Sequence, residues 1–330
     1  MEVFRRGIKI CEARMGLASN NKDLVTRSEY FSDRVMQSLL TDYHRVEDIP
    51  WTPDLDAQID VLDVPGAAPE ITLGRKRALA LGDWTSLEAA ASDRRYTLFG
   101  NLGFLFRYTI RVLEEHHRIW SFHASAMVDE RRGELWLIPG GAGAGKTVFL
   151  LAGLERGWTI FSTEMTHLRV SARGCEWFKG SLFDNVRVGT LLYDFPGVAL
   201  RLGLQLPEVK DPWAHKVALD LGHVQTLTDV LADPPLRIVN PKVESGRERA
   251  IVSRIERREK LVKLLFDSAT EKHGGGVLLY DCIPLASLDT PELAGERLRA
   301  MERLVAAAEI RTAASTLCGA RNCMDGLSDD

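Results

Sequence analysis

A run of small residues that ends in lysine and threonine is the part of the sequence best suited to chemistry. Its residues are Gly140, Gly141, Ala142, Gly143, Ala144, Gly145, Lys146 and Thr147. They satisfy the pattern G-x-x-x-x-G-K-[ST], in which small residues let successive N–H groups curl around one anionic centre. In such a loop the lysine reaches the β- and γ-phosphates of a nucleotide, and the threonine hydroxyl coordinates Mg²⁺. The pattern therefore predicts binding of a nucleoside triphosphate, expected to be ATP, together with Mg²⁺.

The elements around this loop are those that the chemistry requires. An apolar strand is expected at 134–139 and a helix at 146–156, so that the loop joins a strand to the N-terminus of a helix. A strand at 121–128 precedes them, and another at 158–161 follows them. This alternation predicts an α/β core.

A loop of this kind does not by itself distinguish kinases from ATPases, GTPases or nucleotide-gated scaffolds. The sequence holds no LSGGQ signature and no N-K-x-D guanine-reading motif, which disfavours transporter ATPases and GTPases. It also lacks a G-x-S-x-G elbow and any zinc-like spacing of cysteine and histidine, so hydrolase and zinc-enzyme functions have no support.

Three segments together resemble the HPr kinase/phosphorylase superfamily. They are the stretch from His123 to Asp129, the stretch from Pro139 to Thr147, and the stretch from Glu155 to Glu164. More closely, they look like the divergent HPr-kinase-related proteins of bacterial peptide and small-molecule pathways. The resemblance covers roughly residues 120 to 255, with an apparent insertion near 207–235.

The resemblance implies roles for individual side chains. Glu164 falls on the acidic position that accepts the proton of the acceptor hydroxyl, and His123 falls on the family histidine. Thr163 replaces the first acid of the family's acidic pair, which leaves the reverse phosphorylase activity open. Arg247 takes the place of an arginine that assists catalysis. Asp184 is the nearest carboxylate for the metal, because Asn185 stands where the family has a glutamate.

Other interpretations of these residues stay open from the sequence alone. Glu164 could instead hold the water on Mg²⁺, or cap a turn at the surface. His123 could be a polar residue satisfied within a strand. Arg247 lies in a charge-rich run, 244–260, whose charged side chains could simply be exposed to solvent.

The fold class expected is α/β, with an HPr-kinase-like P-loop core, a mixed α+β N-terminal domain and a C-terminal helix. The expected boundaries are an N-terminal domain at 1–97, a connecting helix at 98–119, the core at 120–290, and the C-terminal helix and tail at 291–330. Within the core, a helix is expected at 213–231. The N-terminal domain carries no chemical motif and is expected to contact substrate or a second copy of the chain.

Composition restricts the partners. The chain has 330 residues, 45% of them hydrophobic, and a formal charge of −4, which offers no global attraction to nucleic acid or an anionic membrane. No apolar run reaches the roughly 18–20 residues that span a bilayer, and the five cysteines show no disulfide or zinc spacing. A cytoplasmic location is therefore expected, without nucleic-acid or membrane partners, and the family resemblance implies self-association.

Two functions follow as expectations. The first is an ATP-dependent kinase that transfers the γ-phosphate to a hydroxyl of a peptide, a protein serine or a small metabolite. The second is a nucleotide-gated binding or regulatory protein that uses ATP as a conformational ligand. The acid at Glu164 favours the kinase.

Overall fold

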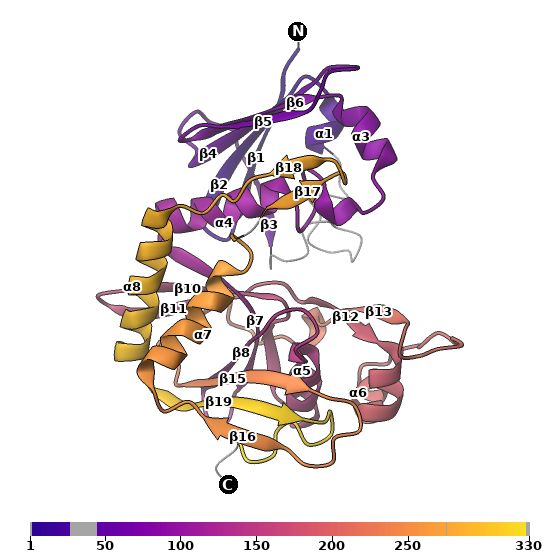
Figure 1. Ribbon diagram of the computed structural model, residues 1–330, viewed down its shortest axis with the longest axis vertical. Coiled ribbons are helices and arrows are strands. Elements are labelled where there is room, and N and C mark those ends of the chain that lie inside the picture. The colour runs from indigo at the N-terminus through magenta and orange to yellow at the C-terminus, as the bar shows by residue number, and fades with distance from the viewer. Residues whose placement is uncertain (1, 27–44, 275, 328–330) are drawn as a thin grey trace. The chain divides into compact units, whose positions relative to one another are not determined.

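The chain forms two compact units in the computed structural model, which describes residues 2–26, 45–274 and 276–327 (Figure 1). Unit 1 contains Met1–Trp120 and Lys272–Ala294, and unit 2 contains Ser121–Glu271 and Gly295–Asp330. The chain therefore leaves unit 1, builds most of unit 2, returns to unit 1 and finishes in unit 2. Every residue that the sequence nominates for chemistry belongs to unit 2.

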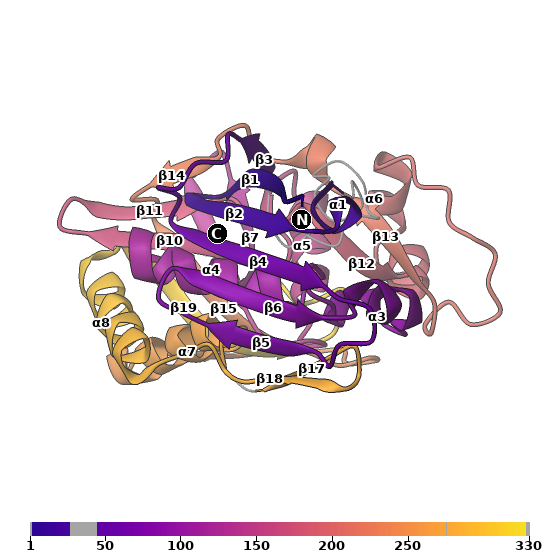
Figure 2. The same cartoon turned by 90° about the horizontal axis from the view of Figure 1, so that it is seen from above.

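Unit 1 is built on a six-stranded sheet with the order β3-β1-β2-β4-β6-β5 (Figure 2). Its strands are β1 (Phe4–Ile10), β2 (Ala13–Ser19), β3 (Val46–Ile49), β4 (Ala57–Asp63), β5 (Glu70–Leu73) and β6 (Arg77–Gly82). The remaining elements are α1 (Lys22–Thr26), α3 (Trp84–Ala90), the short helix η1 (Arg94–Tyr96), α4 (Phe104–His117) and the hairpin of β17 (Val277–Leu279) and β18 (Ile283–Leu285). Helix α4 packs against β2.

The connecting helix expected at 98–119 is present as α4, but it begins later than expected. Leu105, Ile110 and Leu113 are fully buried. The preceding residues form turns and bends, and Gly103 is the N-cap of the helix. A side chain at Gly103 would overlap the carbonyl oxygen of Thr97, so this close approach of the backbone requires glycine.

Unit 2 is organised around a nine-stranded mixed sheet with the order β14-β11-β10-β7-β8-β15-β19-β16, and β9 also pairs with β7. Its strands are β7 (Ile119–Asp129), β8 (Glu134–Pro139), β9 (Thr159–Ser162), β10 (Met165–Ser171), β11 (Gly174–Phe178), β14 (Val230–Ala232), β15 (Leu236–Val243), β16 (Ile251–Arg254) and β19 (Ile310–Cys318). Strand β15 runs parallel to both β8 and β19, so the carboxyl ends of these three strands meet at one edge.

Helices cover both faces of this sheet. They are α5 (Lys146–Glu155), α6 (Pro196–Arg201), α7 (Arg258–Thr270) and α8 (Pro291–Ala307), with the short helices η2 (Thr190–Asp194) and η3 (Gly222–Val224) and the hairpin of β12 (Phe183–Arg187) and β13 (Lys216–Asp220). The α5 face includes Trp136, Ile138 and Val239, which pack with Phe149 and Leu150 of the helix. Helix α7 lies on the other side of β8 (Figure 1).

The predicted elements around the small-residue loop are confirmed as β7, β8, α5 and β9. The helix predicted at 213–231 is wrong, because this segment forms β13, η3 and the start of β14. In β13 burial alternates, with Val217 half-buried and Leu219 buried between exposed neighbours, and this period of two suits a strand. The strand β19 was not predicted.

The coarse prediction of a mixed α/β fold is confirmed by these sheets and helices. Within residues 2–26, 45–274 and 276–327, no helix is both long and apolar enough to cross a bilayer.

Candidate functional site

The small-residue loop joins the end of β8 to the first turn of α5 and depends on two glycines with positive φ. Gly143 has φ 80° and Gly145 has φ 107°, a region that other residues adopt only with strain. A side chain at Gly145 would also lie 2.2 Å from Cγ2 of Val243 on β15. The loop thus packs directly on the neighbouring parallel strand.

Several N–H groups of this loop make no hydrogen bond within the described part of the chain. They belong to Ala142, Gly143, Gly145, Lys146 and Thr147. Gly145 caps α5 through its backbone alone, without a side-chain hydrogen bond. Unbonded N–H groups at the N-terminus of a ten-residue helix form a partial positive charge that suits an anion.

Lys146 is buried at the centre of the site, with 6% of its surface exposed. Its Nζ lies 2.9 Å from the carbonyl oxygen of Gly140 and 3.4 Å from that of Gly141, so the ammonium folds back over the loop. The same atom lies 3.0 Å from Nε2 of His123 and 3.6 Å from Oε2 of Glu164. The structure therefore brings three of the sequence-predicted residues into direct contact.

His123 comes from the middle of β7 and has a carboxylate near each ring nitrogen, but of the two nitrogens only Nε2 is hydrogen-bonded within the described residues. Its Nε2 lies 2.9 Å from Oε2 of Glu164, and its Nδ1 lies 2.7 Å from Oε1 of Glu271. Its carbonyl oxygen accepts a hydrogen bond of 3.1 Å from the hydroxyl of Ser268. Glu164 lies between β9 and β10 and is partly exposed, so it faces both the histidine and solvent.

Thr147 and Asp184 form a second contact beside the lysine. The Thr147 hydroxyl donates a hydrogen bond of 2.8 Å to Oδ2 of Asp184. Burial, and secondarily the charge of Glu164, raise the pKa of Asp184 from its ordinary 3.8 to about 7, against the lowering effect of that hydrogen bond and of Lys146. A buried carboxylate next to another carboxylate is under-compensated by positive charge.

This pair of oxygen ligands fits Mg²⁺. The ion prefers oxygen ligands, takes one or two from the protein and completes its shell with water and substrate phosphates. In the described part of the chain, no group of three or more histidine, cysteine, aspartate and glutamate side chains is arranged to hold a metal on its own. Thr147 and Asp184 are the residues that would hold Mg²⁺ here.

Thr163 and Asn185 replace acidic residues of the HPr kinase/phosphorylase pattern, and they differ in burial. Thr163 is buried, and its hydroxyl donates to the carbonyl oxygens of Ser181 and Phe183, so it supports the backbone. Asn185 is exposed, because neighbouring residues of β12 alternate between faces and Asp184 points inward.

Arg247 was nominated from the sequence but makes no hydrogen bond or ion pair with this cluster in the described part of the chain. It lies in the segment between β15 and β16, where its Nε pairs with Glu244 at 3.2 Å. Within the described residues, no hydrogen bond or ion pair joins Arg247 to Lys146, His123 or Glu164.

Glu271 is the site residue that the sequence did not reveal. It is the C-cap of α7 and lies far from His123 along the chain. Its neighbours in sequence carry no motif, so only the packing of α7 beside β7 brings it to the imidazole.

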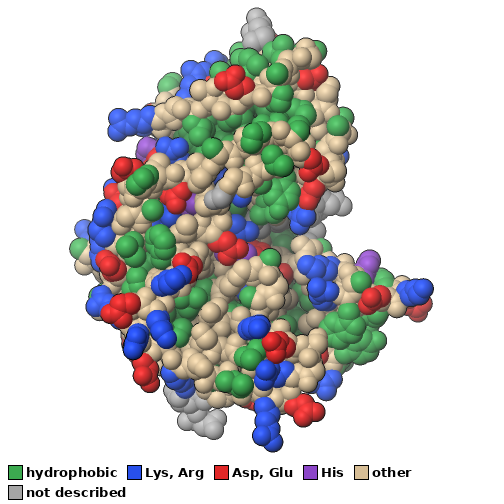
Figure 3. Space-filling model, viewed as in Figure 1, with side chains coloured by type: hydrophobic (Ala, Val, Ile, Leu, Met, Phe, Trp, Pro, Cys, Tyr) green, Lys and Arg blue, Asp and Glu red, His purple; other side chains and the backbone are tan. Residues whose placement is uncertain are grey.

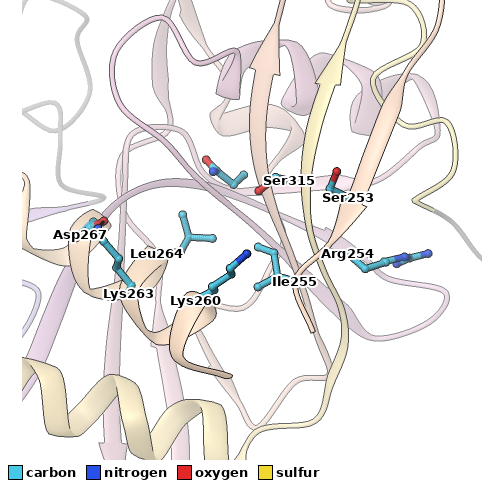
Figure 4. Close-up of a pocket in the computed structure, with 9 residues that line it drawn as sticks. Ser253, Arg254, Ile255, Lys260, Lys263, Leu264, Asp267 and Ser315 are labelled. Atoms are coloured by element: carbon cyan, nitrogen blue, oxygen red, sulfur yellow. Dashed lines mark hydrogen bonds and ion pairs between the residues drawn. The ribbon is translucent and has the colours of Figure 1, made fainter. Parts of the chain in front are cut away.

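A pocket of about 300 Å³ lies on the α7 face of the sheet (Figure 4). Asn240, Ser315 and Ser253 form a row across three adjacent strands at its base, and Lys260 extends toward them from α7. None of the residues nominated from the sequence lines it.

Hydrophobic side chains gather at the surface near α6, β12 and β13 (Figure 3). In the segments that join these elements, Tyr193 and Trp213 are 51% and 41% exposed, with ring centroids 5.9 Å apart. Exposed apolar surface of this kind suits contact with another polypeptide.

No protein-family model matches the chain, and no curated protein matches it.

Proposed function

We propose that the chain is an ATP-dependent kinase that transfers the γ-phosphoryl group to a hydroxyl. The observation that carries this proposal is the convergence of Lys146, His123 and Glu164 beside the loop, with Nζ of Lys146 3.0 Å from Nε2 of His123 and 3.6 Å from Oε2 of Glu164. Phosphoryl transfer needs positive charge on the phosphate and a group that orients the acceptor, with little covalent work by the protein.

We also propose that unit 2 is a P-loop core of the HPr-kinase-like kind. Its support is the order of the elements that carry the site: His123 on β7, the loop between β8 and α5, Glu164 after β9, and Asp184 on β12. The same residues carry the resemblance to the HPr kinase/phosphorylase superfamily.

In the proposed reaction the acceptor oxygen attacks the γ-phosphorus while the bond to the β,γ-bridging oxygen breaks, and ADP leaves. The hydroxyl proton passes to the Glu164 carboxylate. Lys146 and the unbonded loop N–H groups neutralise the phosphate oxygens, and burial of Lys146 strengthens that interaction. Thr147 and Asp184 would hold Mg²⁺, which would neutralise further negative charge on the phosphates.

The acceptor class proposed is a hydroxyl of a peptide, a protein serine or a small metabolite. The exposed pair Tyr193 and Trp213 supports the polypeptide acceptors, because these side chains follow β12, which carries Asp184. Arg247 enters this proposal only through the family pattern, and it would have to leave Glu244 to reach a phosphate.

A second function, a nucleotide-gated binding protein, is supported by a different observation. Lys146 already bonds to the carbonyl oxygens of Gly140 and Gly141, so an arriving phosphate would exchange these contacts and rearrange the loop. Such a protein would change its affinity for a partner with nucleotide state and would release little ADP.

The deciding experiment measures Mg·ATP binding by calorimetry and searches for a phosphorylated product among peptides and hydroxy metabolites by mass spectrometry. Lys146→Ala should lose both binding and product. Glu164→Gln should bind ATP within a few-fold of the wild type while its hydroxyl-dependent ADP release falls about 10²–10⁴-fold. Glu155→Gln, at the exposed end of α5, is the matched control and should behave as the wild type.

A product that forms with the wild type and not with Lys146→Ala would support the kinase. Tight Mg·ATP binding without product from any hydroxyl would overturn it in favour of the nucleotide-gated protein.

A further inference from the structure

We propose that the pocket on the α7 face of unit 2 binds a small polyhydroxy carboxylate. The pocket has a volume of about 300 Å³, which is at the lower end of the range of small-molecule sites, and its lining residues all belong to unit 2. It shares no lining residue with the nominated cluster around Lys146, so the inference does not depend on kinase activity.

The floor of the pocket is a row of polar side chains from three adjacent strands. Asn240 of β15 and Ser253 of β16 both lie opposite Ser315 of β19 in the strand register. Neighbouring strands are about 4.8 Å apart, so the row is about 10 Å wide. The residue that precedes each of the three packs in the core beneath α5. Alternation along the strands therefore places the polar row on the opposite face, below α7.

The side chains of this row have hydrogen-bonding capacity to spare. Within residues 2–26, 45–274 and 276–327, the side chains of Asn240, Ser253 and Ser315 make no hydrogen bond. Asn240 and Ser315 are also half-buried, so part of their polar surface is shielded from water without a protein partner in its place. Each of the three side chains can both donate and accept, which matches the hydroxyl groups of a ligand.

Helix α7 supplies the charge. Lys260, Lys263, Leu264 and Asp267 line the pocket at the i, i+3, i+4 and i+7 spacing of one helical face. Lys263 and Asp267 form an ion pair with each other. Lys260 makes no ion pair in the described part of the chain, and it extends over the polar row (Figure 4). One uncompensated ammonium balances one carboxylate, whereas a phosphate group carries up to about two charges.

Arg254 does not add to this charge. Its guanidinium points away from Lys260 and donates to the carbonyl oxygen of Gly326 (Figure 4). Ile255 and Leu264 complete the lining with apolar surface, which suits the carbon chain of a ligand. The pocket thus offers one cation, a row of groups that donate and accept, and an apolar side. Together they match a carboxylate on a hydroxylated carbon chain.

The first test compares three ligands by calorimetry with the full chain. Gluconate carries both features, sorbitol carries the hydroxyl groups without the carboxylate, and hexanoate carries the carboxylate without the hydroxyl groups. Gluconate should bind with a Kd of about 1 mM or below. Sorbitol and hexanoate should each bind at least about tenfold more weakly, because each lacks one set of hydrogen bonds to the pocket. Absence of gluconate binding, or equal binding of either analogue, would overturn the proposal.

The second test places the binding in the pocket. Lys260→Ala should weaken the affinity for gluconate by about tenfold or more, because it removes the charged partner, and Ser315→Ala should weaken it about 2–10-fold. Lys260 is exposed, so its substitution leaves the core intact. Lys216→Ala, at an exposed lysine of β13, is the matched control and should bind gluconate as the wild type does.

Lys146→Ala distinguishes the pocket from the small-residue loop, whose unbonded N–H groups also suit an anion. Binding of gluconate should persist in this variant. Loss of gluconate binding in Lys146→Ala, or wild-type affinity in Lys260→Ala, would overturn the assignment to the pocket. The expected pattern in a protein that phosphorylates no hydroxyl would uphold this inference and overturn the kinase proposal, so the two failures can be told apart.

Discussion

The side chain of Asp184 combines burial with a neighbouring negative charge. Its pKa is raised to about 7, first by burial and then by Glu164. Burial favours the protonated form of this carboxyl group in the folded protein. A bound cation would favour the ionised form instead. A raised pKa of this kind is expected of a carboxylate that binds a divalent ion.

The raised pKa of Asp184 predicts a pH dependence of stability. Between pH 3.8 and about 7 the folded chain keeps this proton while the unfolded chain has lost it, so the group destabilises the fold as pH rises. Asp184→Asn keeps an acceptor for Thr147 and removes the titration. Between pH 4 and pH 7.5 the wild type should lose up to about 4 kcal/mol of unfolding free energy through this group. Asp184→Asn should not show that loss.

Denaturant unfolding at several pH values, without metal or nucleotide, checks this expectation. The exposed neighbour provides the control, because Asn185→Asp should introduce no comparable slope. Parallel pH profiles for the wild type and Asp184→Asn would contradict the assignment of the raised pKa to Asp184.

At the scale of the element, the junction of β8, the loop and α5 depends on backbone geometry that few residues can adopt. Gly143 and Gly145 both have positive φ, but only Gly145 faces a neighbouring side chain. A substitution at Gly143 would therefore introduce conformational strain alone, whereas one at Gly145 would add steric overlap.

Substituting each glycine with alanine should give different losses. Gly143→Ala should lower the free energy of unfolding by about 1–2 kcal/mol, from the positive φ alone. Gly145→Ala should lower it by about 2–5 kcal/mol, because the new methyl group also displaces Val243 on β15. Thermal unfolding of the two variants checks the difference, and equal losses would show that the overlap with Val243 is relieved without strain.

The elements around the loop were predictable because their signals are local. Strands β7 and β8 are apolar runs separated by a turn, and α5 begins directly after the glycines. Strand β19 could not be recognised in the same way, since its buried positions are Thr312, Ala314, Thr316 and Cys318. Small and polar residues give a weak hydrophobic pattern, so the alternation becomes visible only once the neighbouring strands are known.

In the candidate site, too, some residues could be recognised from local sequence and others could not. Lys146, Thr147, His123, Glu164 and Asp184 were nominated from the sequence, and the structure brings them together. Glu271 was missed because its contact with His123 is created by packing of α7, not by spacing along the chain. Arg247 was nominated from the family pattern but pairs with Glu244 instead.

At the scale of the whole molecule, unit 2 is completed by a segment that contains none of the nominated residues. Strand β19 lies between β15 and β16, and β15 in turn pairs with β8, which leads into the loop. The geometry of the site therefore depends on a strand far from it in sequence.

A chain that ends at Ala308 retains every nominated site residue but lacks β19. We expect it to lose cooperative unfolding of unit 2 and Mg·ATP binding together, because β15 loses one of its two parallel neighbours and β16 loses the strand with which it pairs. Circular dichroism during thermal unfolding and calorimetry with Mg·ATP would check both losses. Binding by the shortened chain at the affinity of the full chain would contradict this dependence.

The passage of the chain from unit 1 to unit 2 and back has a consequence during synthesis. A ribosome produces the chain from the N-terminus, so residues 1–120 emerge before the segment 272–294 that completes unit 1. The strand that carries the loop likewise emerges long before β19. Unit 1 cannot reach its final fold before residue 294 has been made, nor unit 2 before residue 318, and until then the edge of β15 that pairs with β19 is open to wrong pairing. This protein is therefore expected to depend on chaperones while it is being synthesised more than a protein whose domains are finished one after the other.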